Sequence, residues 1–114
     1  MSEETARPER VCFTLKIKEG MLEDYVQAHE DVWPEMLEAL RESGWHNYSL
    51  FVRRRDGLVV GYLETADFNA ALHAVSQREV NDRWQGSMAK YFEIPEGQNP
   101  DDAVLRLDEY FHLD

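Results

Sequence analysis

Three side chains suited to holding a polar ligand recur at intervals of four residues. They are Tyr25, His29 and Trp33, and they would lie along one stripe if this segment is helical. An imidazole with an ordinary pKa of about 6.5 can give or take a proton near neutral pH. Aromatic residues at this spacing are also typical of a helix face packed in a core. The stripe therefore predicts either a proton-transfer site centred on His29 or core packing.

Two further groups of residues are candidates for ligand contacts. In Arg83-Trp84, an indole face beside a guanidinium suits the C–H face and the hydroxyls of a sugar ring. Ion pairing and core packing are the alternative interpretation of such a pair. In His46-Asn47-Tyr48, alternation along a strand would point His46 and Tyr48 to one face and Asn47 to the other.

Metal and cofactor chemistry have no matching motif. His29, Glu30 and Asp31 are adjacent, and adjacent helical residues diverge by about 100°, so they do not converge easily on one ion. The sequence has no H-E-x-x-H spacing, no glycine-rich phosphate loop and no G-x-S-x-G motif. We expect no metal and no cofactor.

The charge balance restricts the partners. Lysine and arginine number 12 against 23 acidic residues, a net charge of −11, which argues against binding to nucleic acid or to membrane surfaces. A neutral or cationic small molecule is the expected ligand. The single cysteine, Cys12, cannot form an internal disulfide, and no apolar run is long enough for a membrane span. We expect a cytoplasmic protein.

Hydrophobic periodicity organises the chain into one domain. Residues 1–10 are polar and carry Pro8, so they are interpreted as a flexible leader, and residues 11–114 as a single domain. Alternation predicts strands over 11–17, 46–53, 58–63 and 104–113, with Leu105, Leu107, Phe111 and Leu113 pointing inward in the last. Helical spacing predicts a helix over 21–43 divided at Pro34, a helix capped by Asp67, and a further helical stretch carrying Val80, Trp84 and Met88.

The order strand, helix, strand, strand, helix, strand is typical of a ferredoxin-like, split βαβ, α+β fold. In this fold the helices cover one face of an antiparallel sheet. The second face of the sheet must also be covered, and Tyr48 and Tyr62 indicate large side chains on the sheet. A homodimer, or a cavity, is the expected solution.

Four groups of residues, taken together, resemble the L-rhamnose mutarotase family. They are Tyr25-x-x-x-His29-x-x-x-Trp33-Pro34-Glu35, Gly44-x-His46-Asn47-Tyr48, Arg83-Trp84, and Asn99-Pro100-Asp101 followed by a strand ending Phe111-His112-Leu113. They cover the chain from about residue 11 to its C-terminus. The resemblance implies a ferredoxin-like protein of the dimeric α/β-barrel type. It also implies an enzyme that interconverts the α and β anomers of L-rhamnose, or of a closely related deoxy sugar.

The resemblance also implies roles for individual residues. It makes His29 the proton donor and places Tyr25, Tyr48, Trp84 and Gln85 in contact with the sugar. The family commonly has Trp-Trp where this chain has Trp84-Gln85, and a glutamine can hydrogen-bond a hydroxyl but cannot stack on a ring. The identity of the sugar is therefore left open.

Acid–base ring opening needs a proton delivered to the ring oxygen and one removed from the anomeric hydroxyl. We expect His29 to donate the proton to the ring oxygen. The residues leave the base open between Tyr25, Tyr48, a carboxylate and a bound water.

Two other functions fit the same pattern of elements. A small ferredoxin-like oxygenase or haem-binding protein would use His29 at its oxygen or iron site. A non-catalytic dimeric ligand-binding module would use Trp84 and Tyr48 to hold a ligand without changing it. Absorbance of bound haem would identify the first, and anomer exchange at the uncatalysed rate would identify the second.

Overall fold

The computed structural model describes residues 8–93 and 104–114. Its elements, in chain order, are β1 (Glu9–Lys16), α1 (Leu22–Ala28), the 3-10 helix η1 (His29–Asp31), α2 (Pro34–Glu42), β2 (His46–Arg53), β3 (Leu58–Thr65), α3 (Phe68–Ser76), α4 (Glu79–Met88), the 3-10 helix η2 (Ala89–Tyr91) and β4 (Leu105–Leu107). Residues 1–7 of the predicted leader, and the Asn99-Pro100-Asp101 motif, lie outside the described residues. Within those residues, no helix is long and apolar enough to cross a bilayer.

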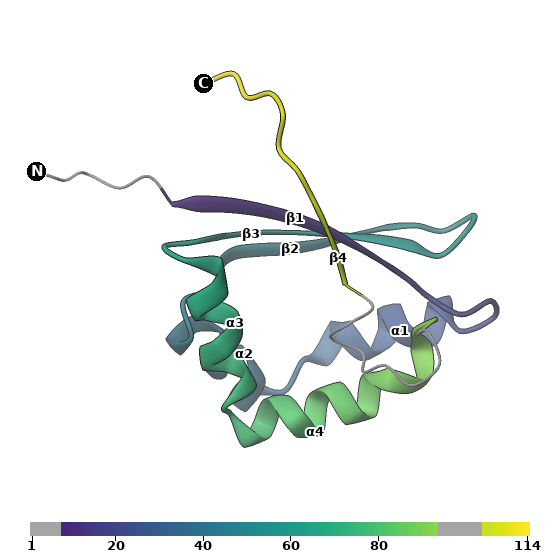
Figure 1. The fold of residues 1–114 in the computed structure, drawn as a ribbon. Helices are drawn as coiled ribbons and strands as arrows, with labels where there is room; N and C mark the ends of the chain where they lie inside the picture. The colour runs from purple at the N-terminus through teal and green to yellow at the C-terminus, as the bar shows by residue number, and fades with distance from the viewer. Residues whose placement is uncertain (1–7, 94–103) are drawn as a thin grey trace, which may run out of the picture.

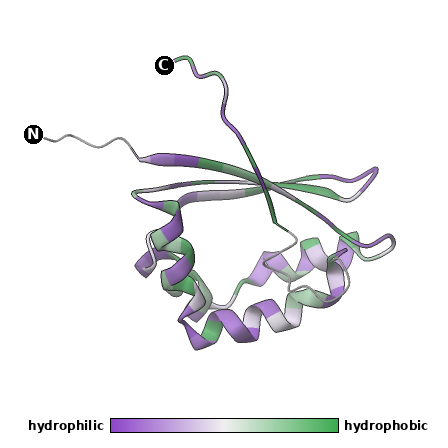
Figure 2. Ribbon diagram, viewed as in Figure 1, coloured by the Kyte–Doolittle hydropathy of each residue, from purple (hydrophilic) through white to green (hydrophobic). Residues whose placement is uncertain are grey.

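The strands form one antiparallel sheet in the order β2-β3-β1-β4. The helices lie on one face of this sheet (Figure 1), which confirms the predicted ferredoxin-like α+β fold. Alternate residues of β1 and β3 are buried against the helices, as expected for a sheet with one covered face. Figure 2 shows hydrophobic residues along the middle of the sheet and hydrophilic ones at the β2–β3 hairpin.

The long helical segment is divided at the proline. α1 ends at Ala28, η1 carries the chain to Asp31, and α2 begins at Pro34 with Trp33 as its N-cap. Proline is favoured at a first helical position, because the N–H that it lacks has no partner there. The predicted division is confirmed, and the backbone becomes extended at Val32, between η1 and α2.

The end of α2 is set by Gly44, which has a φ of 94°. Its N–H bonds to the carbonyl of Arg41 at 3.1 Å, and the N–H of Trp45 bonds to the carbonyl of Leu40 at 2.9 Å. This pair of bonds is the Schellman motif, in which a left-handed glycine closes the helix. The motif places Trp45 between the helices and the sheet.

The last strand is much shorter than predicted. β4 covers 3 residues, Leu105–Leu107, and the chain beyond it leaves the sheet (Figure 1), leaving Phe111 and Leu113 exposed. Leu105 and Leu107 pair with Thr14 and Cys12, whose side chains lie on the face away from the helices. The predicted inward orientation is therefore wrong. Alternation alone cannot tell which of two faces a strand turns inward, and a strand extends only where a neighbour pairs with it.

Candidate active site

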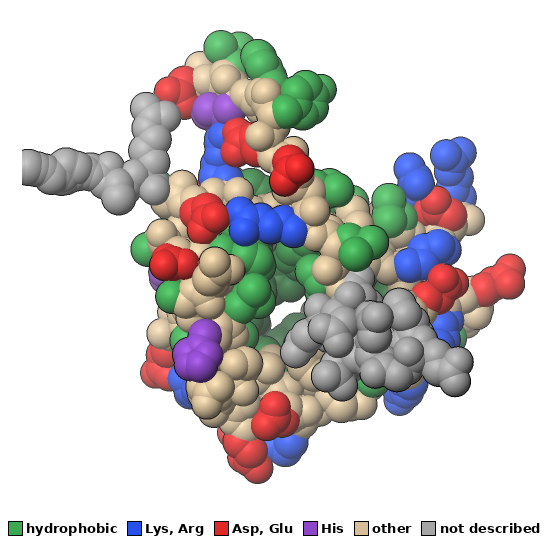
Figure 3. All heavy atoms as spheres, viewed as in Figure 1, with side chains coloured by type: hydrophobic (Ala, Val, Ile, Leu, Met, Phe, Trp, Pro, Cys, Tyr) green, Lys and Arg blue, Asp and Glu red, His purple; other side chains and the backbone are tan. Residues whose placement is uncertain are grey.

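A cavity of about 830 Å³ lies between the helices and the sheet, and Figure 3 shows hydrophobic side chains around a hollow near the centre of the molecule. Its lining includes the five residues to which the family resemblance gives a role: Tyr25, His29, Tyr48, Trp84 and Gln85. They come from α1, η1, β2 and α4. Pockets of about 300–1,000 Å³ are typical of small-molecule sites. The fold therefore brings these residues to one partly open cavity of suitable size.

His29 is held in a defined orientation at the end of α1. Its Nδ1 lies 3.0 Å from the backbone carbonyl of Tyr25, one helical turn earlier, and a carbonyl only accepts, so Nδ1–H donates to it. Desolvation by burial lowers the pKa of His29, and the bond to Tyr25 partly opposes this shift. Nε2 has no hydrogen-bond partner in the described part of the chain. A neutral imidazole in this tautomer has its proton-accepting lone pair on Nε2.

The two tyrosines of the pocket are uncharged donors. Burial raises the pKa of Tyr25 to about 12. Desolvation also raises the pKa of Tyr48, and the neighbouring Tyr25 phenol raises it further, although the residue as a whole is 36% exposed. Neither phenol ionises near neutral pH, so each can donate its O–H to a ligand oxygen but cannot act as a tyrosinate base.

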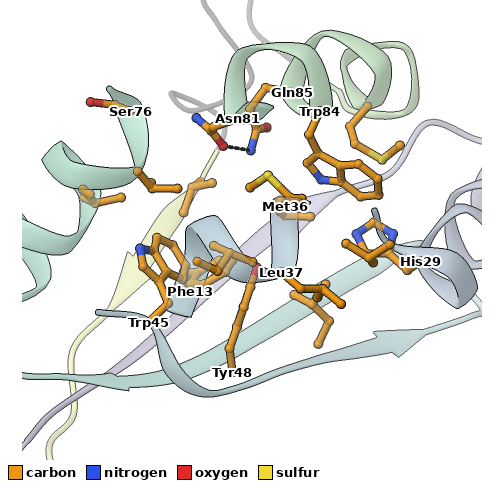
Figure 4. A pocket seen from close by; sticks show the side chains of 18 of the residues that line it. Phe13, His29, Met36, Leu37, Trp45, Tyr48, Ser76, Asn81, Trp84 and Gln85 are labelled. Carbon is orange, nitrogen blue, oxygen red and sulfur yellow. Dashed lines mark hydrogen bonds between the residues drawn. The ribbon is translucent and has the colours of Figure 1, made fainter. Parts of the chain in front are cut away.

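Trp84 forms the wall next to His29. Its indole meets the imidazole edge-on at a centroid distance of 5.4 Å, and it meets Trp33 edge-on at 5.0 Å. Figure 4 shows His29 directly beneath the indole. Such edge-to-face contacts are a favoured arrangement of aromatic rings. Trp33 supports Trp84 from behind and does not line the cavity.

The Arg83-Trp84 dipeptide is split between the surface and the pocket. Arg83 lies outside, with its guanidinium 3.4 Å from Glu35 and 5.9 Å from the centre of the Trp33 ring. Neighbouring residues on a helix point in directions about 100° apart, so Trp84 faces inward while Arg83 faces solvent. The arginine therefore stabilises the outer surface and does not reach a ligand in the cavity.

His46 and Tyr48 do not share a face, which is a correction to the predicted alternation. His46 pairs with Glu64 and Ser49 pairs with Tyr62, so β2 has one more residue than β3 across this interval. Asn47 takes a φ of 50° at this β-bulge. The extra residue changes the alternation, so that Tyr48 lines the cavity and His46 does not. Asn47 Nδ2 donates to Glu64 at 3.2 Å.

Asn81 and Trp45 line the cavity, and sequence reasoning did not single them out. Asn81 precedes Trp84 and Gln85 by three and four positions, so helical spacing from Trp84 could have found it. Trp45 packs on Tyr48 at a centroid distance of 5.1 Å and donates from Nε1 to the carbonyl of Ala71 at 3.2 Å. No local pattern marks Trp45, because its position depends on the turn at Gly44.

The fold and the cavity define a ferredoxin-like α+β protein with a partly open cavity between its helices and its sheet. The family model described as L-rhamnose mutarotase matches residues 10–113. The L-rhamnose mutarotase of Bacillus subtilis (strain 168) is 36% identical over 98 residues, covering 86% of this chain and 91% of that protein. The L-rhamnose mutarotase of Pectobacterium carotovorum (strain PC1) is 33% identical over 107 residues, covering 92% and 98%. The chain belongs to the L-rhamnose mutarotase family, and it is an isomerase, as the motifs predicted.

Solved structures agree on the fold. The crystal structure of an L-rhamnose mutarotase from Formosa agariphila superposes with a TM-score of 0.75 at 23% identity, covering 93% of this chain and 99% of that one. An antibiotic biosynthesis monooxygenase superposes with a TM-score of 0.57 at 21% identity, covering 89% and 97%. One fold thus accommodates different reactions, so the function must be argued from the family and from the site.

Proposed function

We propose that this enzyme interconverts the α and β anomers of L-rhamnose, or of a closely related deoxy sugar, by acid–base ring opening and closure. The family supports the reaction. The observation that carries the assignment to a site is the orientation of His29, with Nδ1 bound to its own helix and Nε2 unpaired within the described residues, in the wall of a cavity with room for a sugar.

The state of His29 suggests how the proton moves. A neutral Nε2 takes the proton of the anomeric hydroxyl as the bond between C1 and the ring oxygen breaks, and the resulting imidazolium gives a proton to that ring oxygen. The products are an aldehyde and a hydroxyl, and the imidazole is neutral again. Both oxygens are bonded to C1, so one nitrogen can serve both. Closure on the other face of the aldehyde reverses these steps and produces the other anomer.

The remaining side chains hold the sugar. Trp84 offers an apolar surface to the C–H face of the ring. Tyr25 and Tyr48 remain protonated and donate hydrogen bonds to sugar oxygens, and Gln85 supplies a polar contact on the α4 wall. Positioned acid–base groups contribute typically about 10²–10⁴-fold in rate.

The test is magnetisation transfer between the anomeric protons of L-rhamnose, measured by NMR with catalytic amounts of protein. We expect the parent to exchange the anomers above the uncatalysed rate and the His29→Asn variant to lose about 10²-fold or more of that excess. His46→Asn is the matched control, because it makes the same change outside the cavity and should leave exchange intact. Full activity in His29→Asn would remove this residue from the mechanism, and no exchange by the parent would refute the reaction.

We also propose that the enzyme is a homodimer that works in the cytoplasm. The sheet face away from the helices carries Phe51, Leu105 and Leu107, which are 61%, 64% and 47% exposed. Exposed hydrophobic patches of this kind mark interaction surfaces. A second copy of the chain that packs on this face would bury these exposed side chains. The single cysteine fits a reducing compartment.

A further inference from the structure

Asn81 is a buried amide on the cavity wall to which the proposed reaction gives no role. It is 5% exposed and shares the inner face of α4 with Trp84, Gln85 and Met88, all of which line the cavity. A primary amide in such a place costs stability unless its donors and acceptor are paired. A leucine would pack there without this cost, so the polar group is more simply explained by a ligand.

The amide pairs with Gln85 one helical turn later. Gln85 Nε2 donates to Asn81 Oδ1 at 3.2 Å, and Figure 4 shows this bond on the α4 wall of the cavity. Each amide has one donor end and one acceptor end, so a single bond between the two leaves one NH₂ and one carbonyl oxygen unused. Within residues 8–93 and 104–114, neither unused end has another partner.

An adjacent donor and acceptor fit sugar hydroxyls. A hydroxyl can both accept from the NH₂ and donate to the oxygen, and two neighbouring hydroxyls can divide the contacts between them. Nearby walls are apolar or aromatic, with Met36 and Trp84 beside the pair (Figure 4). The pair therefore adds directional recognition beside Met36 and Trp84, which supply contact area.

The position of the pair relative to His29 indicates which hydroxyls it meets. In Figure 4 the side chains of the pair lie on the side of Trp84 that faces away from His29. In a pyranose ring, C4 lies across from C1 and C3 lies across from the ring oxygen. A sugar that places C1 and its ring oxygen at His29 while resting on Trp84 directs C3 and C4 toward the amides.

We propose that Asn81 and Gln85 together bind the C3 and C4 hydroxyls of the sugar and make these hydroxyls the ones on which substrate choice depends. This rests on the proposed function, because it takes the reacting edge of the sugar to be at His29. The substrate class is an aldopyranose with free hydroxyls at both carbons.

The test combines loss of a hydroxyl from the sugar with loss of an amide from the protein. Anomer-exchange rates and dissociation constants are measured for L-rhamnose and its 2-deoxy, 3-deoxy and 4-deoxy analogues. The proteins compared are the parent, Asn81→Leu and Gln85→Leu. Gln77→Leu is the control, because it makes the same change at an exposed residue outside the cavity.

In the parent and in the control, we expect at least one analogue to bind about 5- to 100-fold more weakly than L-rhamnose, because losing the hydroxyl leaves a buried polar group unpaired. In Asn81→Leu and Gln85→Leu the same analogue should bind less than about threefold more weakly than L-rhamnose, because the partner of the hydroxyl is already gone. Equal losses in all four proteins would overturn the proposal. So would a loss confined to a 2-deoxy analogue.

The dissociation constants distinguish a failure of this proposal from a failure of the proposed reaction. If the parent binds the sugars and the variants abolish its discrimination, the amide contact stands even where no anomer exchange is seen, and only the proposed function fails. If exchange is seen but discrimination is unchanged in the variants, only the amide contact fails. Leucine at position 81 removes a buried polar group, so the thermal midpoint of Asn81→Leu should not fall, which keeps the variant usable. The partly exposed Gln85 provides a second variant.

Discussion

At the residue scale, the proposed reaction depends on the charge state of His29. Burial lowers its pKa from the ordinary value, which favours the neutral imidazole at pH 7, and in the proposed mechanism Nε2 accepts a proton before giving one. The choice of catalytic base narrows accordingly, because the raised pKa values of Tyr25 and Tyr48 keep both phenols protonated.

This charge state predicts the pH dependence. The catalysed rate should be full above about pH 6.5, the ordinary pKa of histidine, and should fall as the pH drops through the lowered pKa of His29, because protonation removes the Nε2 lone pair. Exchange measured by NMR across the acidic and neutral range, with the uncatalysed rate subtracted, checks this. A rate that climbed on acidification would mean that an imidazolium starts the reaction as the acid.

At the element scale, β1 and β3 shape the floor of the cavity through a single glycine. A Cβ built on Gly61 would lie 2.2 Å from Cζ of Phe13, so the ring lies directly across the strand where only a hydrogen fits. A strand glycine often marks such a close approach. Phe13 in turn lines the cavity and lies 6.4 Å from the Tyr48 ring, centroid to centroid.

Gly61→Ala should therefore destabilise the protein by about 1–3 kcal/mol through overpacking and weaken sugar use by displacing Phe13. Urea unfolding and the Michaelis constant for L-rhamnose measure the two effects. Gly86→Ala is the matched control: a Cβ there meets nothing within 4 Å, and the change should stabilise α4 by roughly 0.5–1 kcal/mol. Equal stability of Gly61→Ala and the parent would show that Phe13 is free to move aside.

At the scale of the whole molecule, one face of the sheet is not covered by the helices. Helices cover only one face (Figure 1), while Phe51, Leu105 and Leu107 stand on the other. An apolar sheet face in water favours association. This is the physical basis for proposing a homodimer.

Light scattering coupled to size exclusion should give the parent twice the mass of one chain. Phe51→Glu and Leu107→Glu should weaken the dimer by on the order of 10²-fold or more, because each places an unpaired carboxylate in the interface. Gln27→Glu adds the same charge to an exposed position on α1 and should leave the mass unchanged. A parent that runs as a monomer at micromolar concentration would refute the assembly.

The parts of the fold that depend on near neighbours were predictable from the sequence. Helical and strand periods and the break at Pro34 arise from interactions within a few residues, and the structure has each of them. The family motifs likewise pointed to His29, Tyr48 and Trp84 before any cavity was known.

Tertiary structure decided the features that depend on pairing between distant segments. The bulge at Asn47 places His46 and Tyr48 on different faces of the sheet. The length of β4 depends on the residues of β1 that pair with it. The amide of Asn81 can be recognised as a candidate ligand contact only because it lines the cavity. Local sequence sets the period of an element, but which face is buried, and what meets across the space between elements, depends on how the whole chain packs.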